Sequence, residues 1–147
     1  MEGGDNKKWT NEEVDKEFLN SIQIKNIYEY LHENKIKLEL KKQKKVTYHK
    51  PCNIENLEDI EWILKNTKNL EYIEMNDFDK CCGLNGLAKV NEYRIMSTIF
   101  KNKHNNIRNS NAKIVTTSCL GCEIGLKAYS FGKYKVFDLI EFIAKNI

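Results

Sequence analysis

The spacing of apolar residues along the chain predicts five helices. Leu57, Ile60 and Leu64, for example, recur at roughly the 3.6-residue period that places side chains on one face of a helix. The expected helices span about residues 13–33, 57–64, 87–103 and 119–130, with a fifth after Asp138. Residues able to cap a helix precede three of these stretches, namely Asn53 or Asn56, Ser118 and Asp138.

Four short stretches between these helices are rich in the β-branched and aromatic residues that strands favour. They cover residues 45–49, 70–75, 112–117 and 134–137. Because a helix separates each strand from the next, we expect a parallel sheet with helices on its faces, which is an α/β fold. The basic run at residues 41–45 is expected to be a solvated approach to the first strand, with a docking patch for an acidic partner as the alternative.

Length and composition are those of one globular domain. The chain has 147 residues, of which 41% are apolar and 31% charged, with a single proline. We expect a disordered lead at residues 1–12 and one domain over residues 13–147. The net charge of +3 is spread over interleaved acidic and basic residues, which argues against a nucleic-acid partner.

Hydropathy argues against a membrane-spanning segment. No stretch approaches the roughly 20 consecutive apolar residues that a transmembrane helix needs. The first residues are polar and lack the apolar core of a signal peptide. We therefore expect a cytoplasmic protein without a transmembrane segment, with peripheral membrane association through its partners as an option.

The five cysteines of the chain form one pattern. A single cysteine is followed by a vicinal pair with a glycine and then by a Cys-x-x-Cys pair, at Cys52, Cys81-Cys82-Gly83, and Cys119 and Cys122. Neighbouring Cα atoms lie about 3.8 Å apart, whereas a disulfide usually joins Cα atoms roughly 5.5 Å apart, so a vicinal pair is poorly suited to a disulfide. Each group of cysteines follows a predicted strand. Because the carboxyl ends of parallel strands share one edge, we expect all five thiols at one site.

Clustered thiols in a reducing compartment are usually metal ligands or redox groups. An iron–sulfur cluster accepts several thiolates from dispersed loops, whereas a structural zinc needs only four ligands. The number of thiols therefore favours an iron–sulfur cluster, with a zinc site or a thiol-redox pair at Cys119 and Cys122 as alternatives. His49 is expected to be a packed residue more than a hydrogen-bond donor to a cluster, and His32 and His104 are expected to be solvated.

The cysteine pattern resembles the CCG cysteine-rich domain, a family found in heterodisulfide reductase and in the iron–sulfur subunits of glycolate and lactate oxidases. The similarity covers about residues 20–147 and includes the stretch before the first cysteine and the one before the last pair, Val46-Thr47-Tyr48-His49-Lys50-Pro51 and Ile114-Val115-Thr116-Thr117-Ser118. Most members carry two such cysteine-rich units, and this chain has one. Asn53 also stands where relatives often have histidine.

The resemblance implies a Rossmann-like three-layer fold with about four parallel strands. It also implies a [4Fe-4S] cluster, which in heterodisulfide reductase is noncubane, and Gly83 as the turn residue beside the vicinal pair. The implied ligands are Cys52, Cys81, Cys82, Cys119 and Cys122. By resemblance the chain is an electron-transfer subunit or domain, without catalytic residues of its own, that works with a flavin-containing dehydrogenase subunit or another iron–sulfur redox subunit. An enzyme that cleaves a disulfide at its cluster is the alternative.

Overall fold

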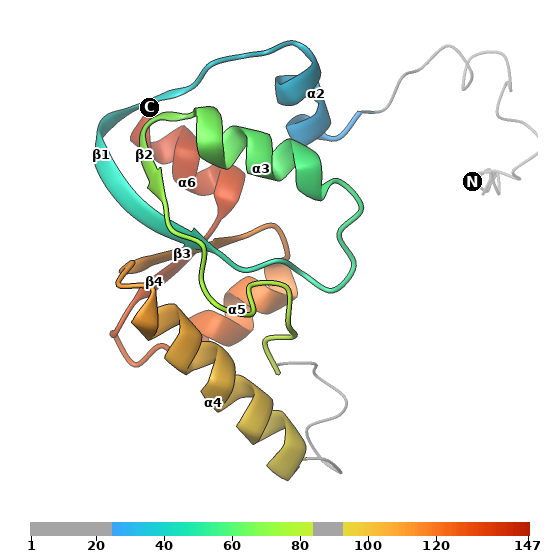
Figure 1. The fold of residues 1–147 in the computed structure, drawn as a ribbon, viewed down its shortest axis with the longest axis vertical. Coiled ribbons are helices and arrows are strands. Elements are labelled where there is room, and N and C mark those ends of the chain that lie inside the picture. The colour runs from blue at the N-terminus through green and yellow to red at the C-terminus, as the bar shows by residue number, and fades with distance from the viewer. Residues whose placement is uncertain (1–24, 84–92) are drawn as a thin grey trace, which may run out of the picture.

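The computed structural model describes residues 25–83 and 93–147, which form an α/β fold around a four-stranded sheet (Figure 1). The strand order is β2-β1-β3-β4, and each neighbouring pair is parallel. The strands are β1 (Glu39–Tyr48), β2 (Lys68–Tyr72), β3 (Ile114–Thr117) and β4 (Lys135–Asp138). The helices are α2 (Ile27–Glu33), α3 (Leu57–Asn66), α4 (Tyr93–Asn109), α5 (Leu120–Ala128) and α6 (Leu139–Asn146). The predicted alternation of helices and parallel strands is confirmed for this part of the chain.

One face of the sheet carries the larger apolar core. Val46 and Tyr48 are two positions apart on β1, so their side chains lie on the same face of the sheet, where both are fully buried. They pack with Ile60 and Leu64 of α3 and with Phe142 of α6. The helices α2, α3 and α6 therefore cover this face, which is the upper part of the molecule in Figure 1.

The opposite face carries a smaller core and, as described below, the cysteines. Val115 of β3 and Val136 of β4 are buried here with Ile107 of α4 and Leu126 of α5. Cys82 belongs to the same cluster. The two helices α4 and α5 thus complete the third layer, below the sheet in Figure 1.

The first strand is longer than expected. The prediction that residues 41–45 only approach a strand is wrong, because these residues are part of β1. Most of their side chains are exposed, as expected, but Lys44 and Lys45 are in register with Leu70 and Glu71 of β2, after an irregularity in the pairing between Glu39 and Lys44. Ion pairs join the two strands at their charged ends, from Lys45 to Glu71 at 3.2 Å and from Lys68 to Glu39 at 2.8 Å.

Some of the predicted helix caps are found in the structure and others are not. Asp138 caps α6, as predicted, and its carboxylate accepts hydrogen bonds from the backbone N–H groups of Ile140 and Glu141. Asn56 occupies the cap position of α3 without a side-chain bond to the helix. Ser118 does not cap α5, because its hydroxyl pairs with that of Tyr48 at 2.8 Å. The parts of predicted helices at residues 13–24 and 87–92 lie outside the described residues, as does the lead at residues 1–12.

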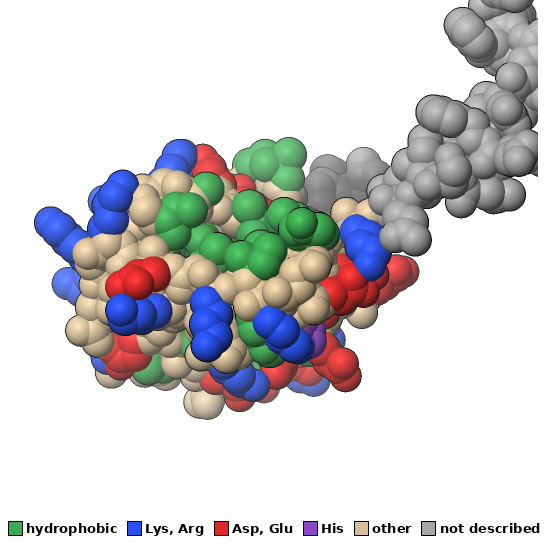
Figure 2. All heavy atoms as spheres, turned by 90° about the horizontal axis from the view of Figure 1, so that it is seen from above, with side chains coloured by type: hydrophobic (Ala, Val, Ile, Leu, Met, Phe, Trp, Pro, Cys, Tyr) green, Lys and Arg blue, Asp and Glu red, His purple; other side chains and the backbone are tan. Residues whose placement is uncertain are grey.

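The surface carries charges of both signs. On the face seen in Figure 2, lysine and arginine side chains alternate with aspartate and glutamate around an apolar area. None of the helices within residues 25–83 and 93–147 is long and apolar enough to cross a membrane.

Candidate metal centre

The structure brings the five cysteines together at the carboxyl ends of the strands. Cys52 lies in the loop after β1, and Cys81 and Cys82 lie in the segment between β2 and α4. Cys119 occupies the cap position of α5, and Cys122 lies in the first turn of that helix. The expectation that three separate loops deliver their thiols to one edge of the sheet is thus confirmed.

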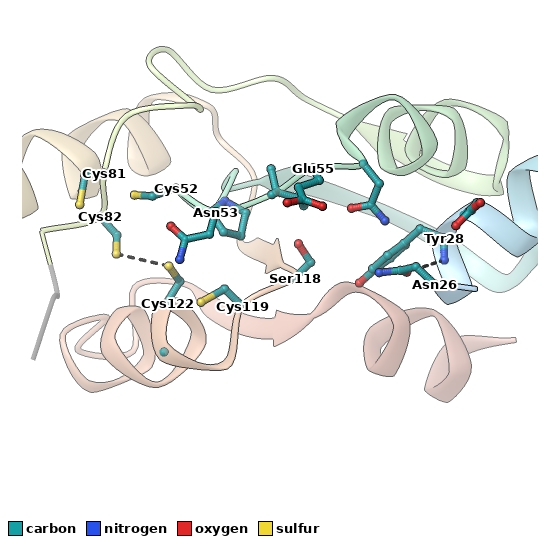
Figure 3. Close-up of a pocket in the computed structure, with 15 residues that line it drawn as sticks. Asn26, Tyr28, Cys52, Asn53, Glu55, Cys81, Cys82, Ser118, Cys119 and Cys122 are labelled. Carbon is teal, nitrogen blue, oxygen red and sulfur yellow. Dashed lines mark hydrogen bonds between the residues drawn. The ribbon is translucent and has the colours of Figure 1, made fainter. Parts of the chain in front are cut away.

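These thiols line one cavity of about 740 Å³. Figure 3 shows that their sulfur atoms gather at one end of it. The other end is lined by polar and aromatic side chains from α2 and its cap, including Asn26 and Tyr28. A volume of this size is in the usual range of small-molecule sites. Because the sulfur atoms lie at one end only, the cavity extends well beyond them.

Two of the sulfur atoms are already spaced like ligands of a single metal. The Cys82 thiol donates a hydrogen bond to the Cys122 sulfur across 3.6 Å. Two thiolates bound to one tetrahedral metal at about 2.3 Å stand about 3.8 Å apart. The pair therefore fits a shared metal atom with little movement of the chain.

Gly83 shapes the vicinal pair. Its φ of +74° lies in the left-handed region that glycine tolerates best. A Cβ at this position would come within 2.8 Å of both the carbonyl oxygen of Met96 and the backbone nitrogen of Phe100. The N–H of Gly83 also donates to the Cys81 sulfur at 3.3 Å. The glycine thus lets the cysteine loop lie against the backbone of α4, and it supplies a donor to one thiol.

Exposure falls from one side of the site to the other. Cys52 is exposed, and Cys81, Cys119 and Cys122 are half-buried. Cys82 lies in the core with only 4% of its surface exposed. The site is therefore open to solvent on the Cys52 side and closed toward the sheet.

Burial and neighbouring thiols make two of the cysteines, Cys122 and Cys52, hard to ionise. The pKa of Cys122 is raised, first by its hydrogen bond with Cys82 and then by burial and the negative charge of neighbouring thiolates. Partial burial raises the pKa of Cys52 as well, and the charge of Cys81 adds to this effect. A metal cation removes this penalty because it binds thiolates and neutralises their charge. The donor set and its electrostatics therefore fit a multivalent, sulfur-seeking metal centre.

Sequence comparison assigns the segment that contains these cysteines to a known family. Residues 46–127, more than half of the chain, match the family model for the CCG cysteine-rich domain, and all five cysteines fall inside the match. The chain belongs to the CCG cysteine-rich domain family.

Three relatives show where this domain occurs. The chain is 30% identical to a fumarate reductase (CoM/CoB) subunit of Methanothermobacter marburgensis, over 67% of this chain and 22% of the relative. It is 25% identical to a dihydromethanophenazine:CoB–CoM heterodisulfide reductase subunit of Methanosarcina acetivorans, over 71% of this chain and 28% of the relative. It is 28% identical to the probable glycolate oxidase iron–sulfur subunit of Bacillus subtilis, over 56% of this chain and 19% of the relative. The CCG domain described here thus spans less than a third of each of these proteins.

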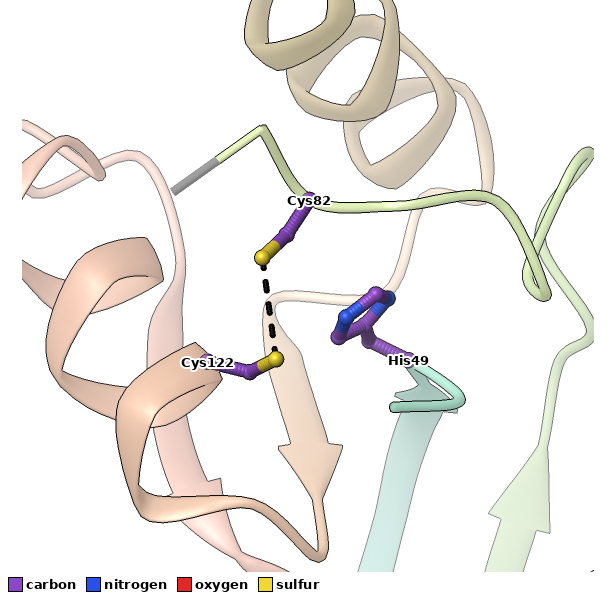
Figure 4. A group of neighbouring side chains, drawn as sticks. All are labelled: His49, Cys82 and Cys122. Carbon is purple, nitrogen blue, oxygen red and sulfur yellow. Dashed lines mark hydrogen bonds between the residues drawn. The ribbon is translucent and has the colours of Figure 1, made fainter. Parts of the chain in front are cut away.

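Within this CCG domain, His49 lies closer to the cysteines than its sequence position indicated. The residue is fully buried, as a packed histidine would be, but neither ring nitrogen has a hydrogen-bond partner among the described residues. One of its ring nitrogens and the sulfur atoms of Cys82 and Cys122 all lie within 4.8 Å of one another. Figure 4 shows its ring beside this pair of sulfur atoms.

Lys103 of α4 was missed by the sequence analysis. Only 2% of its surface is exposed, and its ammonium group donates to the backbone carbonyl of Asp77. Burial lowers the pKa of Lys103, while the negative charges of Cys82 and Asp77 oppose that shift. The signal was present in the sequence, because Lys103 continues an apolar stripe of α4 between Phe100 and Ile107.

The other two histidines are paired, and the expectation that they are solvated is wrong. His32 is half-buried, hydrogen-bonds Asp59 at 2.6 Å and stacks on Trp62. His104 is half-buried beside Tyr134, with 3.2 Å between its Nδ1 and the phenol oxygen. Both histidines therefore support packing of the helices and do not line the cavity.

Proposed function

We propose that this CCG domain is an iron–sulfur electron-transfer unit. In this proposal a [4Fe-4S] cluster is held by thiolates from three loops, with Cys52, Cys81, Cys82, Cys119 and Cys122 as its ligands. The observation that carries the proposal is the convergence of all five thiols at one end of a single cavity. Such a cluster supplies one-electron chemistry, and the chain's own residues hold it, shield it and leave one side open.

The names of the relatives support this function. One of the three named above is an iron–sulfur subunit, and all three are subunits by name, including one of a heterodisulfide reductase. We propose that the chain likewise passes electrons to or from a partner, either a flavin-containing dehydrogenase subunit or another iron–sulfur subunit. The surrounding system would be related to 2-hydroxy-acid oxidases or heterodisulfide reductases. Five cysteines that form no disulfide favour the reducing cytoplasm as the location.

The first test is metal and sulfide analysis of protein purified without oxygen. About four iron and four sulfide per chain are expected, as for one [4Fe-4S] cluster. EPR spectra of the oxidised and reduced protein then separate a cubane from a noncubane cluster. Replacement of Cys82 or Cys122 by serine is expected to abolish the cluster. Ser118→Ala is the matched control, since this residue lines the same cavity without a sulfur atom and should leave the iron content unchanged.

A zinc site is the second candidate. It is favoured by the compact group of Cys82, Cys122 and His49, whose ligand atoms are close enough for one metal ion. One zinc per chain with no sulfide would support this candidate and refute the iron–sulfur proposal. Full zinc binding by a variant that lacks Cys52 would point the same way, because four coordination positions do not need a fifth cysteine.

A further inference from the structure

Three polar side chains without partners among the described residues lie on the face of the sheet that carries the cysteines. They are Thr47, His49 and Thr117, whose hydroxyl or ring nitrogen atoms are buried. Thr47 pairs in register with Val115, a core residue of this face, and alternation places His49 on the same side. The backbone N–H of His49 donates to the Thr116 carbonyl at 2.8 Å, which continues the ladder and brings Thr117 alongside. Buried polar side chains without a described partner are thus concentrated in one strip of this face, across β1 and β3.

Such a strip is costly in a folded protein. A buried donor or acceptor without a partner loses its bonds to water and gains none in return, so native structures rarely leave several together. His49 is the extreme case, because both of its ring nitrogens lack a partner in the described part of the chain while none of its surface is exposed. A neighbouring group that accepts a hydrogen bond from the ring would remove this cost.

The His49 ring lies beside two of the cysteines (Figure 4). One ring nitrogen of His49 lies within 4.8 Å of the sulfur atoms of Cys82 and Cys122, which are themselves 3.6 Å apart. Thiolate and sulfide sulfur bound to iron accept hydrogen bonds, and these bonds are among the factors that set the potential of a cluster. Residues that bond to metal ligands in this way also orient them.

We propose that His49 is a positioning residue that donates an N–H hydrogen bond to sulfur at the Cys82–Cys122 edge of the cluster. This bond raises the reduction potential of the cluster because it stabilises the more negative, reduced state. The inference rests on the proposed iron–sulfur function. The other ring nitrogen, like the Thr117 hydroxyl, is buried without a partner among the described residues.

The test compares the wild-type protein with three histidine variants. His49→Phe keeps a flat ring of similar size without the donor, and His49→Gln restores an N–H donor. His104→Phe is the control, since His104 lies in α4 on the same side of the sheet but hydrogen-bonds Tyr134 and does not line the cavity. Each protein is analysed for iron, sulfide and midpoint potential, and the wild type labelled with 15N-histidine is examined by pulsed EPR.

The expected result is full iron and sulfide in all four proteins, with a more negative potential in His49→Phe alone. A roughly tenfold change in the reduction equilibrium is expected, which is about 59 mV for one electron. His49→Gln should recover part of the shift. The labelled wild type should show one weakly coupled histidine nitrogen, and this signal does not depend on whether His49→Phe folds.

Two results would overturn the inference while leaving the proposed function in place. An unchanged potential in a loaded His49→Phe protein, or no coupled nitrogen in the wild type, would make His49 a packing residue. A strongly coupled nitrogen, accompanied by loss of iron in His49→Phe, would make it a direct ligand. If the wild type holds no iron and sulfide at all, the proposed function itself fails, and the inference fails with it before any variant is compared.

Discussion

Replacement of Gly83 by alanine tests whether the vicinal cysteines depend on a close approach to α4. Alanine in the left-handed region costs roughly 1–2 kcal/mol. The added methyl group would also meet two backbone atoms of α4 at 2.8 Å, and neither atom can rotate away as a side chain would. Overpacking of this kind costs about 1–3 kcal/mol more. The expected loss is therefore about 2–5 kcal/mol of the free energy of unfolding.

The chain offers a matched control for this substitution. Gly132 has almost the same backbone angle, with φ of +73°, but a Cβ there would meet no atom of the described residues within 4 Å. Gly132→Ala should therefore show the backbone cost alone, about 1–2 kcal/mol. Urea unfolding of the metal-free proteins, followed by circular dichroism, gives both values.

The difference between the two alanine variants isolates the contact with α4. We expect Gly83→Ala to be about 1–3 kcal/mol less stable than Gly132→Ala, and to lose bound iron because Cys81 and Cys82 shift with the loop. Equal stabilities within about 0.5 kcal/mol, with full iron content in both, would refute this reasoning. The close approach of Gly83 would then contribute nothing to the site.

Three further predictions concern separate parts of the structure. Lys103→Met should make the potential of a bound cluster more negative in a redox titration, because it removes a buried positive charge that interacts with Cys82 and so favours the more negative, reduced state. Asp138→Ala should reduce the free energy of unfolding by about 1 kcal/mol, since it removes both bonds that cap α6, whereas Asn56→Ala should change it by no more than about a few tenths of a kcal/mol. Burial raises the pKa of Tyr134 from 10.0 to about 12, so the unfolded chain releases this proton first. The free energy of unfolding should therefore fall as the pH rises from about 10 to about 12, and absorbance at the phenolate band should show delayed ionisation.

Each of these has a clear contrary outcome. An unchanged potential in Lys103→Met would show that the buried ammonium is neutral or too far from the cluster. Equal losses of unfolding free energy in Asp138→Ala and Asn56→Ala would show that the two hydrogen bonds that cap α6 do not stabilise the protein. Stability that stays constant from about pH 10 to about pH 12, with Tyr134→Phe as the comparison, would show that this phenol is not buried in solution.

Local patterns in the sequence predicted the elements that depend on local interactions. The cap at Asp138 follows from a carboxylate that bonds to the N–H groups two and three residues later. The parallel sheet follows from the alternation of helices and strands, and the convergence of the cysteines follows from the sheet. These steps need periodicity and topology but no knowledge of individual contacts.

Features that depend on distant partners could not be predicted in the same way. Residues 41–45 are four lysines and a glutamine with no apolar pattern, and yet β1 runs through them, with Lys44 and Lys45 in register with β2. His32 looks solvated in sequence until α2 packs on α3 and brings it to Asp59, 27 residues away. The proximity of His49 to Cys122 likewise exists only after β1 and β3 have paired.

The uneven exposure of the five cysteines makes one side of this site, at Cys52, more susceptible to oxidation than the rest. Oxidants attack cysteines according to their accessibility, so damage should begin at the exposed Cys52 and reach the buried Cys82 last. A protein that covers the Cys52 side would shield it from dioxygen and peroxide. In an aerobic cell, the open side would then be the surface whose coverage by a bound protein protects the site most.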